Sequence, residues 1–461
     1  MVLPSQALPT RNIQLDFFRG VALMVVFINH MPDNPWFWYT PSRFGLSDAA
    51  DVFVFLSGFA SALAYGRCFE RAGLWLGTVR ILHRCSHIYG AHLASFVLLA
   101  LICVMGNRWV PEMDDIQRLN IAYFFDTTQQ ALYDLFTLAY VPNYFDILPM
   151  YLVMLSWLPL FWLLSRLHVA VAMGCSVALY WATWHYGWEF TADPASGRPW
   201  YFNPLSWQLL FFTGFAFGAG WLKIAINQSW LLAMCCLIVL VSIPLEYESL
   251  YQQSAFWSKL RLVLEPWFNK SHLGLLRCVH LLALAYLMRH LIHWQPQWLS
   301  NPLSSTIVTM GQQSLAIFLF SMLLSYAGGI ALDRFGREQA FAVAVVNLSG
   351  LASMLITGYI IAWLDSKPWK TTTDKNPVQY DHGSATPGFV RHYSWNSQIL
   401  ALPFLMGLAV LPTLLIDQVS ATSGVSGDLV VQIQPTQELQ PAEALTPEID
   451  ADNLIDGQKQ L

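Results

Sequence analysis

Ten apolar segments, each about as long as a bilayer is thick, constrain this chain more than any other feature. A window of about 19 residues places them at 14–32, 50–67, 86–106, 145–164, 168–187, 205–224, 229–245, 271–290, 306–328 and 340–364. An eleventh, more isolated segment covers 398–416. Because lipid offers no hydrogen bonds to the backbone, such segments cross it as helices. The sequence predicts an all-α, polytopic membrane helical bundle of ten core transmembrane helices plus an eleventh.

The amino-acid composition supports a membrane protein. Hydrophobic residues make up 55% and charged residues 11% of the 461 residues, whereas a soluble domain carries about 25% charged residues. The seven cysteines lie in or beside apolar segments without metal-ligand spacing, so we expect neither disulfides nor a metal site. Asp16 and Arg19 interrupt the place of a signal-peptide core, so no cleavable signal is expected. The expected partner is the lipid bilayer, with no nucleic acid; the oligomeric state stays open.

The distribution of arginines predicts which way the chain crosses the membrane. Arg67, Arg71, Arg80 and Arg84 crowd the short connection between the second and third segments. Positive charge marks cytoplasmic loops, so this connection and the N-terminus are both expected in the cytoplasm. The long connection 107–144 mixes aromatic and polar residues and is expected to be interfacial or re-entrant.

Four parts are expected along the chain. A transmembrane domain covers 1–365, a polar linker 366–397, the additional transmembrane helix 398–416, and an acidic tail 417–461. The tail is poor in large apolar residues, so it cannot bury a core and is expected to be disordered. No inverted repeat of the transporter kind is evident.

Three polar residues interrupt the first apolar segment, although charge inside lipid is costly. Arg19 and His30 are eleven residues apart, which is about 16 Å along a helix, and after three turns they share one face. Asp16 precedes Arg19 by three residues and is expected to pair with it. Two interpretations are open. The residues form a functional strip, or the arginine snorkels to the headgroups and the histidine lies at the outer interface.

Motifs in the following segments give these residues a context. DFFRG (Asp16–Gly20) is followed by His30 and by DVFVFLSGF (Asp51–Phe59), and this order resembles the transmembrane acyltransferase superfamily. Further stretches resemble one branch of it, the OpgC family, associated with succinylation of osmoregulated periplasmic glucans. They are IYGAHL (Ile88–Leu93), LPMYL (Leu148–Leu152), NPLSWQLLFFTG (Asn203–Gly214), HLLALAY (His280–Tyr286) and QQSLAIFLF (Gln312–Phe320). The resemblance covers residues 10–365; the chain departs from it where His83 and His87 flank Arg84 in place of further arginines.

The resemblance implies a membrane O-acyltransferase of about ten helices in the bacterial inner membrane. Such enzymes carry acyl groups from a cytoplasmic donor to extracytoplasmic glycans. We therefore expect an acyl-CoA, by resemblance succinyl-CoA, as donor substrate, a periplasmic glucan as acceptor, and no permanently bound cofactor. An acetyltransferase acting on another cell-surface glycan is an alternative within the class. A non-enzymatic membrane transporter and a non-catalytic scaffold are alternatives outside it.

Acyl transfer to a sugar hydroxyl needs a base and a way to align donor with acceptor. His30 lies toward the outer side and has a suitable pKa range, and the resemblance points to the same residue as general base. Arg19, oriented by Asp16, suits contact with the phosphates of the donor. Arg84 is a further donor candidate or a simple cytoplasmic anchor. Asp51 holds the tautomer of His30, contacts the acceptor, or caps the second segment.

Five other residues are candidates for the acceptor site or the tunnel. Asn143 and Asp146 stand just before the motif LPMYL, and Asn203 and Trp207 belong to NPLSWQLLFFTG. For a tryptophan, the simpler interpretation is the aromatic belt found at membrane interfaces. Ser314 either lines the tunnel or forms a hydrogen bond between helices.

Overall fold

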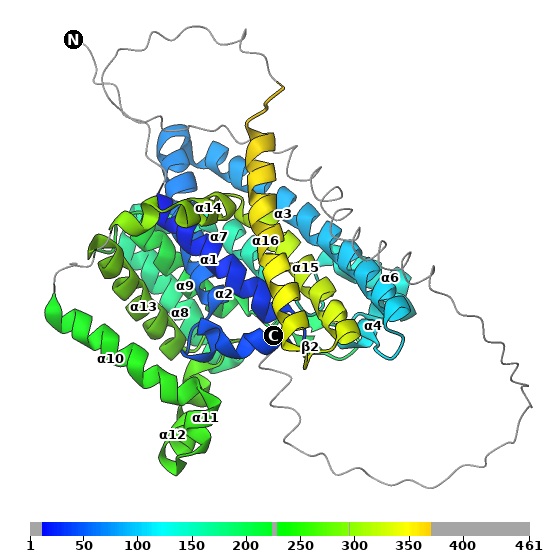
Figure 1. Ribbon diagram of the computed structural model, residues 1–461. Coiled ribbons are helices and arrows are strands. Elements are labelled where there is room, and N and C mark those ends of the chain that lie inside the picture. Colours follow the sequence, from blue (N-terminus) through cyan, green and yellow to red (C-terminus); the bar gives the residue numbers. More distant parts are fainter. Residues whose placement is uncertain (1–11, 224–227, 295, 370–461) are drawn as a thin grey trace, which may run out of the picture.

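Long helices account for most of this fold, and Figure 1 shows how they pack against one another. The computed structural model describes residues 12–223, 228–294 and 296–369. Its longer helices are α1 (Ile13–His30), α2 (Ala49–Ser61), α3 (Arg67–Trp109), α7 (Ile147–Leu167), α8 (Val169–Tyr186), α9 (Pro204–Gly218), α10 (Ser229–Glu246), α12 (Ala255–Phe268), α13 (Leu275–Trp294), α14 (Pro302–Gln312), α15 (Ser314–Phe335) and α16 (Ala340–Asp365).

Short elements connect these helices. They are η1 (Pro35–Tyr39), η2 (Pro41–Arg43), η3 (Ala62–Gly66), α4 (Asp115–Arg118), α5 (Ala122–Asp126), α6 (Thr128–Thr137), α11 (Glu248–Gln252), η4 (Pro296–Ser300) and an antiparallel pair of strands, β1 (Thr191–Asp193) and β2 (Arg198–Pro199). The connection 107–144 holds only α4, α5 and α6 after the end of α3. None of the three reaches the length that a bilayer requires, as expected of an interfacial or re-entrant stretch.

Seven segments of the described chain are long and apolar enough to cross a membrane. They are Ile13–His30, Ala49–Trp109, Ile147–Leu167, Ser229–Glu246, Leu275–His293, Ser314–Phe335 and Ala340–Asp365. The segment Ala49–Trp109 contains two of the predicted spans. Helices α8 and α9 coincide with two further predicted spans, but α8, with 18 residues, is not apolar enough and α9, with 15 residues, is too short to meet the same requirements. A membrane helical bundle is therefore confirmed, while the number of ten spans stays a prediction.

Three of the predicted parts fall largely beyond the described residues. The additional helix at 398–416 and the acidic tail at 417–461 lie wholly outside them, and so does the polar linker at 366–397 except for its first few residues. The predictions for these parts, and the domain boundaries drawn from them, stay predictions.

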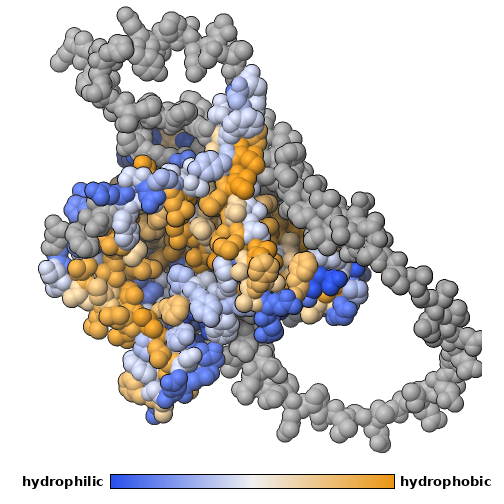
Figure 2. Space-filling view, in the orientation of Figure 1, coloured by the Kyte–Doolittle hydropathy of each residue, from blue (hydrophilic) through white to orange (hydrophobic). Residues whose placement is uncertain are grey.

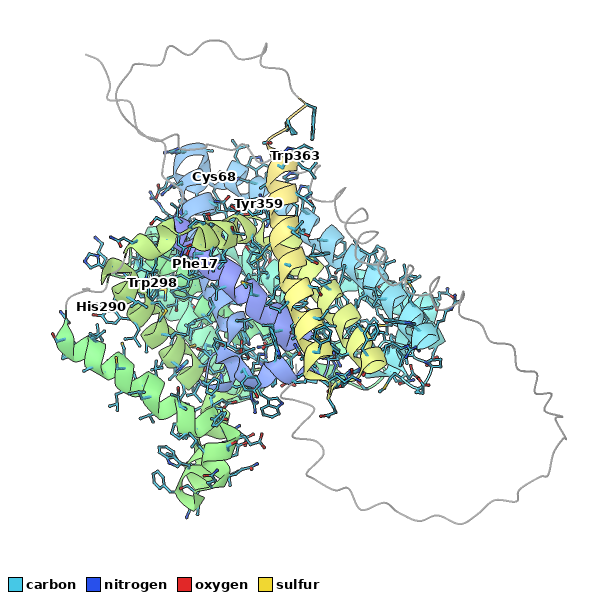
Figure 3. The ribbon with its side chains drawn as sticks, viewed as in Figure 1. Phe17, Cys68, His290, Trp298, Tyr359 and Trp363 are labelled. Carbon is cyan, nitrogen blue, oxygen red and sulfur yellow. The ribbon has the colours of Figure 1, made fainter. Side chains whose placement is uncertain are left out.

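The surface of the bundle suits a bilayer. Apolar side chains gather in a band across the face seen in Figure 2, with hydrophilic residues toward both ends. Phe341, Leu262 and Trp181 each expose more than half of their surface, which is unfavourable in water and suits lipid. Tyr359 and Trp363 lie near one end of α16 in Figure 3, where interfacial aromatic residues are common.

Two glycines of the sequence motifs allow close helix crossings. A Cβ atom added to Gly58 of α2 would lie 1.8 Å from the carbonyl oxygen of Phe211 on α9. One added to Gly20 of α1 would lie 2.4 Å from the carbonyl oxygen of Ile307 on α14. Both distances are too short for any side chain, and small residues are the usual means of close helix approach in membranes. These crossings fix α1 and α2, which carry much of the candidate site.

Candidate active site

Two cavities lie in the bundle at different levels along α1. We call the end at which α1 begins the inner end, and the end at which α1 finishes the outer end. The inner cavity has a volume of about 450 Å³ and is bordered by Arg19. The outer cavity has a volume of about 230 Å³ and is bordered by His30. The polar strip of α1 thus reaches two separate cavities.

His30 is held by its own helix. It is the last residue of α1, and its Nδ1 atom lies 2.9 Å from the carbonyl oxygen of Val26. Since a carbonyl oxygen only accepts hydrogen bonds, Nδ1 carries the proton. In the neutral imidazole, Nε2 is then the unprotonated nitrogen. The ring is therefore in the tautomer that a general base requires.

Tyr144 packs against this imidazole. The two ring centres are 5.4 Å apart and the ring planes meet at 62°, an edge-to-face arrangement. Tyr144 also borders the outer cavity, and its backbone adopts a φ of 72°. A bulky residue seldom takes this left-handed conformation, and such strain gathers at functional sites. Sequence reasoning missed Tyr144, because no local pattern marks a single strained loop residue.

Asp51 is engaged by an arginine from a distant helix. Its carboxylate accepts hydrogen bonds from Arg277 on α13, from Nε at 3.3 Å and Nη2 at 2.5 Å, and from the backbone N–H of Asp48 at 2.8 Å. The last contact belongs to the capping box that starts α2. Among the described residues no hydrogen bond joins Asp51 to His30. The capping role of Asp51 is thus present, and its role as partner of the imidazole stays a prediction.

Asp48 brings two buried cations to the outer cavity. Its Oδ2 atom lies 2.8 Å from Lys270 Nζ and 3.2 Å from Arg277 Nη2. Burial opposes the charged form of Asp48, but the positive charges of Lys270 and Arg277 outweigh it and lower the pKa of the carboxyl. Because of Asp48, the pKa of Lys270 is raised in spite of its burial. Lys270 and Arg277 were missed as site residues, although an arginine within an apolar segment is a functional signal.

Asp146, a candidate for the acceptor mouth, borders the outer cavity. Its Oδ1 atom accepts a hydrogen bond from the backbone N–H of Tyr201 at 3.1 Å and lies 3.7 Å from Arg198 Nη1. Burial raises the pKa of Asp146 to about 6, against the opposing charge of Arg198. The carboxyl group therefore titrates near neutral pH.

Three other candidates for the acceptor site do not border this cavity. Asn203 caps α9 by accepting from Leu205 N–H at 3.0 Å. Trp207 is fully buried, and its Nε1 atom donates to the carbonyl oxygen of Lys270 at 3.0 Å. The Oδ1 atom of Asn143 is buried without a hydrogen-bond partner in the described chain. Asn203 and Trp207 support the loop that carries Lys270, and direct contact of any of the three with an acceptor stays a prediction.

The inner cavity brings together two of the three predicted donor residues. Arg19 and Arg84 border it, and so does Ser314, which was a candidate for the acceptor site or the tunnel. Arg19 Nη2 donates to the carbonyl oxygen of Leu56 at 3.2 Å, which fixes the guanidinium against α2. Asp16 is buried one turn before Arg19, and its expected pairing with Arg19 stays a prediction.

Further basic residues border the inner cavity. Arg80 donates to the carbonyl oxygen of Ala64 at 3.2 Å, and His83 lies beside it on α3. The Nε2 atoms of His83 and His87 are 3.0 Å apart. In the described residues no cluster of three or more His, Cys, Asp or Glu side chains is arranged to hold a metal ion. With Arg19, Arg80 and Arg84 at its border, the inner cavity is suited to an anion with several charges.

Comparisons with known proteins show the family to which the sequence is similar. The model of a family described as "OpgC protein" matches residues 11–366. A curated protein of Rhizobium radiobacter, "Protein 2 in picA locus", is similar, with 34% identity over 121 residues, which are 25% of this chain. The chain spans 59% of the length of that relative. No solved structure matches.

Proposed function

The chain belongs to the OpgC protein family, which indicates a membrane acyltransferase acting on glycans, and on this premise we propose its donor and acceptor. The donor is cytoplasmic acyl-CoA carrying a succinyl group. The acceptor is a hydroxyl group of a periplasmic glucan or related polysaccharide. The protein lies in the bacterial inner membrane with its N-terminus in the cytoplasm.

One observation carries the proposal. Helix α1 presents Arg19 to the inner cavity and His30 to the outer cavity. The two residues are eleven positions apart on one continuous helix, which corresponds to about 16 Å. A long, thin donor arm suits this separation, with its phosphates at the Arg19 level and its thioester at the His30 level.

The tautomer of His30 supports a role as general base. Nε2 of His30 accepts the proton of the acceptor hydroxyl while the hydroxyl oxygen attacks the thioester carbonyl carbon. The tetrahedral intermediate collapses as the C–S bond breaks, and the sulfur leaves with the proton that the imidazolium returns. The new ester stays on the glucan and the free thiol on the donor. The hydrogen bond from Nδ1–H to Val26 stabilises the imidazolium throughout.

The basic residues of the inner cavity support the donor site. Arg19, Arg80 and Arg84 border one cavity, and guanidinium groups suit bidentate contact with phosphate oxygens. A concentration of arginine at this end also agrees with a cytoplasmic side.

Aromatic rings and carboxylates of the outer cavity support a sugar acceptor. Tyr201 and Phe202 border it beside Asp146 and Lys270. Rings offer flat apolar faces to a sugar, and charged side chains form hydrogen bonds with its hydroxyl groups. We assign the acceptor to this cavity, with Asp146 as a contact residue.

Membrane vesicles that contain the protein test the proposal. Labelled succinyl-CoA and, separately, acetyl-CoA are supplied with periplasmic glucans, and the wild type is compared with His30→Ala. We expect label from succinyl-CoA on the glucan with the wild type and its near loss with His30→Ala. If only acetyl-CoA labels the glucan, the donor is acetyl-CoA and not succinyl-CoA. If the wild type and His30→Ala label the glucan equally, His30 does not take part in the reaction.

A further inference from the structure

The two cavities meet at two apolar side chains. Ile147 on α7 and Phe318 on α15 each border both the inner and the outer cavity, and they alone do so among the described residues. Both side chains are half-buried. Phe318 also packs edge-to-face against Phe53 of α2, with ring centres 6.4 Å apart. The two cavities are thus adjacent, and Ile147 and Phe318 lie between them.

Helices α2 and α7 pass from one cavity to the other near this level, and α15 reaches the outer cavity at Phe318. On α7, Asp146 just before the helix borders the outer cavity, and Leu148 borders the inner one. On α2, Ala50 borders the outer cavity and Phe53 the inner one. On α15, Ser314 borders the inner cavity one turn before the shared Phe318. Helices α1, α2, α7 and α15 therefore border both cavities, and the two side chains that the cavities share are apolar.

We propose that Ile147 and Phe318 form the constriction through which the acyl end of the donor passes from the inner to the outer cavity. The pair also sets the largest acyl group that is transferred. This inference rests on the proposed function, because a donor held at Arg19 must cross this level to bring its thioester to His30. Once the acyl group has crossed, the uncharged part of the donor arm next to the thioester lies between the two side chains.

The chemistry of the two sides fits this passage. An apolar constriction disfavours water, so it separates the aqueous donor side from the outer cavity and limits donor hydrolysis. The carboxylate of a succinyl group loses its hydration only while it passes between Ile147 and Phe318. The cavity that it enters is bordered by polar side chains, among them Lys270 and Arg277 with their partner Asp48, and these offer hydrogen bonds to the carboxylate.

Substitution of Phe318 tests the size limit. We expect Phe318→Ala to raise the rate of benzoyl-CoA transfer relative to succinyl-CoA transfer by about tenfold or more, since pocket volume governs such ratios. The matched control is Leu315→Ala, which removes an apolar side chain that borders the inner cavity only. The control should keep the wild-type ratio.

Chemical blocking of Ile147 tests the passage in a single folded protein. Ile147→Cys is treated with a methyl or a benzyl thiosulfonate reagent, and the wild type with its own free cysteines is treated in parallel. We expect the benzyl group to lower transfer by about tenfold or more, while succinyl-CoA binding measured with the labelled donor is retained. The methyl group should have little effect, and bound donor should slow the labelling of Ile147→Cys.

The outcomes separate the two proposals. An unchanged benzoyl-to-succinyl ratio in Phe318→Ala, or full transfer by benzyl-modified Ile147→Cys, overturns the constriction. If Phe318→Ala does not fold, the blocked Ile147→Cys protein decides the question. Absence of transfer from any acyl-CoA by the untreated wild type is a failure of the proposed function instead.

Discussion

The Nδ1 atom of His30 lies 2.9 Å from the carbonyl oxygen of Val26, one turn earlier on the same helix. The helix backbone therefore sets the tautomer of the imidazole without help from a carboxylate. In many hydrolases an acidic side chain has this task. Asp51, the residue that the sequence suggested for this task, is bound to Arg277 instead.

Replacement of His30 is expected to impair the chemical step. Loss of a general base lowers rates by roughly 10²- to 10⁴-fold, so His30→Ala should lower kcat by that factor. Donor binding, measured with labelled acyl-CoA in the absence of acceptor, should stay near the wild-type value because Arg19 borders the other cavity. Equal loss of donor binding and of turnover would instead indicate that His30 supports the fold.

Replacement of Arg19 by lysine is expected to affect the donor. The substitution keeps the charge but removes the guanidinium fork, and the weaker phosphate contact should raise the donor KM by about tenfold, equivalent to about 1.4 kcal/mol. The matched control is Arg43→Lys, a cation of the outer cavity, which should leave the donor KM unchanged. Steady-state kinetics with saturating acceptor gives both values. A donor KM that does not change in Arg19→Lys contradicts phosphate contact.

The raised pKa of Asp146 predicts a pH-dependent stability. Since burial raises this pKa from 3.8 to about 6, the protonated carboxyl is favoured in the folded state. The resulting stabilisation is fully present below about pH 4 and is lost as the pH rises through about 6. The free energy of unfolding falls by about 3 kcal/mol over this range. Asp146→Asn is neutral at every pH, so the Tm of the wild type minus that of the variant should fall between pH 4 and pH 7.

Thermal unfolding of the detergent-solubilised proteins measures this difference. Asp126→Asn, which alters an exposed carboxyl group, is the control and should show a constant difference across the same pH range. A difference for Asp146→Asn that is constant or rises with pH would contradict a buried carboxyl group at this place.

The Arg277–Asp51 pair predicts a large but recoverable loss of stability. Arg277→Met leaves the fully buried Asp51 without its cation, and removal of one partner of a buried pair costs about 3–5 kcal/mol. The double variant Arg277→Met with Asp51→Leu removes both charges and should recover a large part of that loss. Denaturant unfolding of the two variants and of Asp51→Leu completes a double-mutant cycle. Strictly additive effects would show that the two side chains do not interact.

The helices, and the placement of Arg19 and His30 along one face of α1, were predictable because both depend on residues close together in the sequence. Every predicted span within the described residues contains a helix, because a long apolar segment has no other way to cross lipid. The common face of Arg19 and His30 follows from helical periodicity. The number of spans does not follow from the same argument, because a predicted span such as α9 has only 15 residues.

The contacts of the outer cavity were not predictable, because they join residues far apart in the chain. Arg277 was visible as a charge inside the segment 271–290, yet nothing local identifies Asp48 and Asp51 as its partners. The same holds for Phe318. Its motif reads as an ordinary apolar helix, and only the packing of α15 against other helices brings it to the boundary between the cavities.

The most direct test of transfer across the membrane uses proteoliposomes with a single known orientation. Labelled succinyl-CoA is placed on the side of the inner cavity and glucan on the side of the outer cavity, and label on the glucan is measured with time. The account predicts labelling in this arrangement by the wild type, little in the reverse arrangement, and labelling slowed by roughly 10²- to 10⁴-fold with His30→Ala. Labelling that requires donor and glucan on the same side of the bilayer would contradict it.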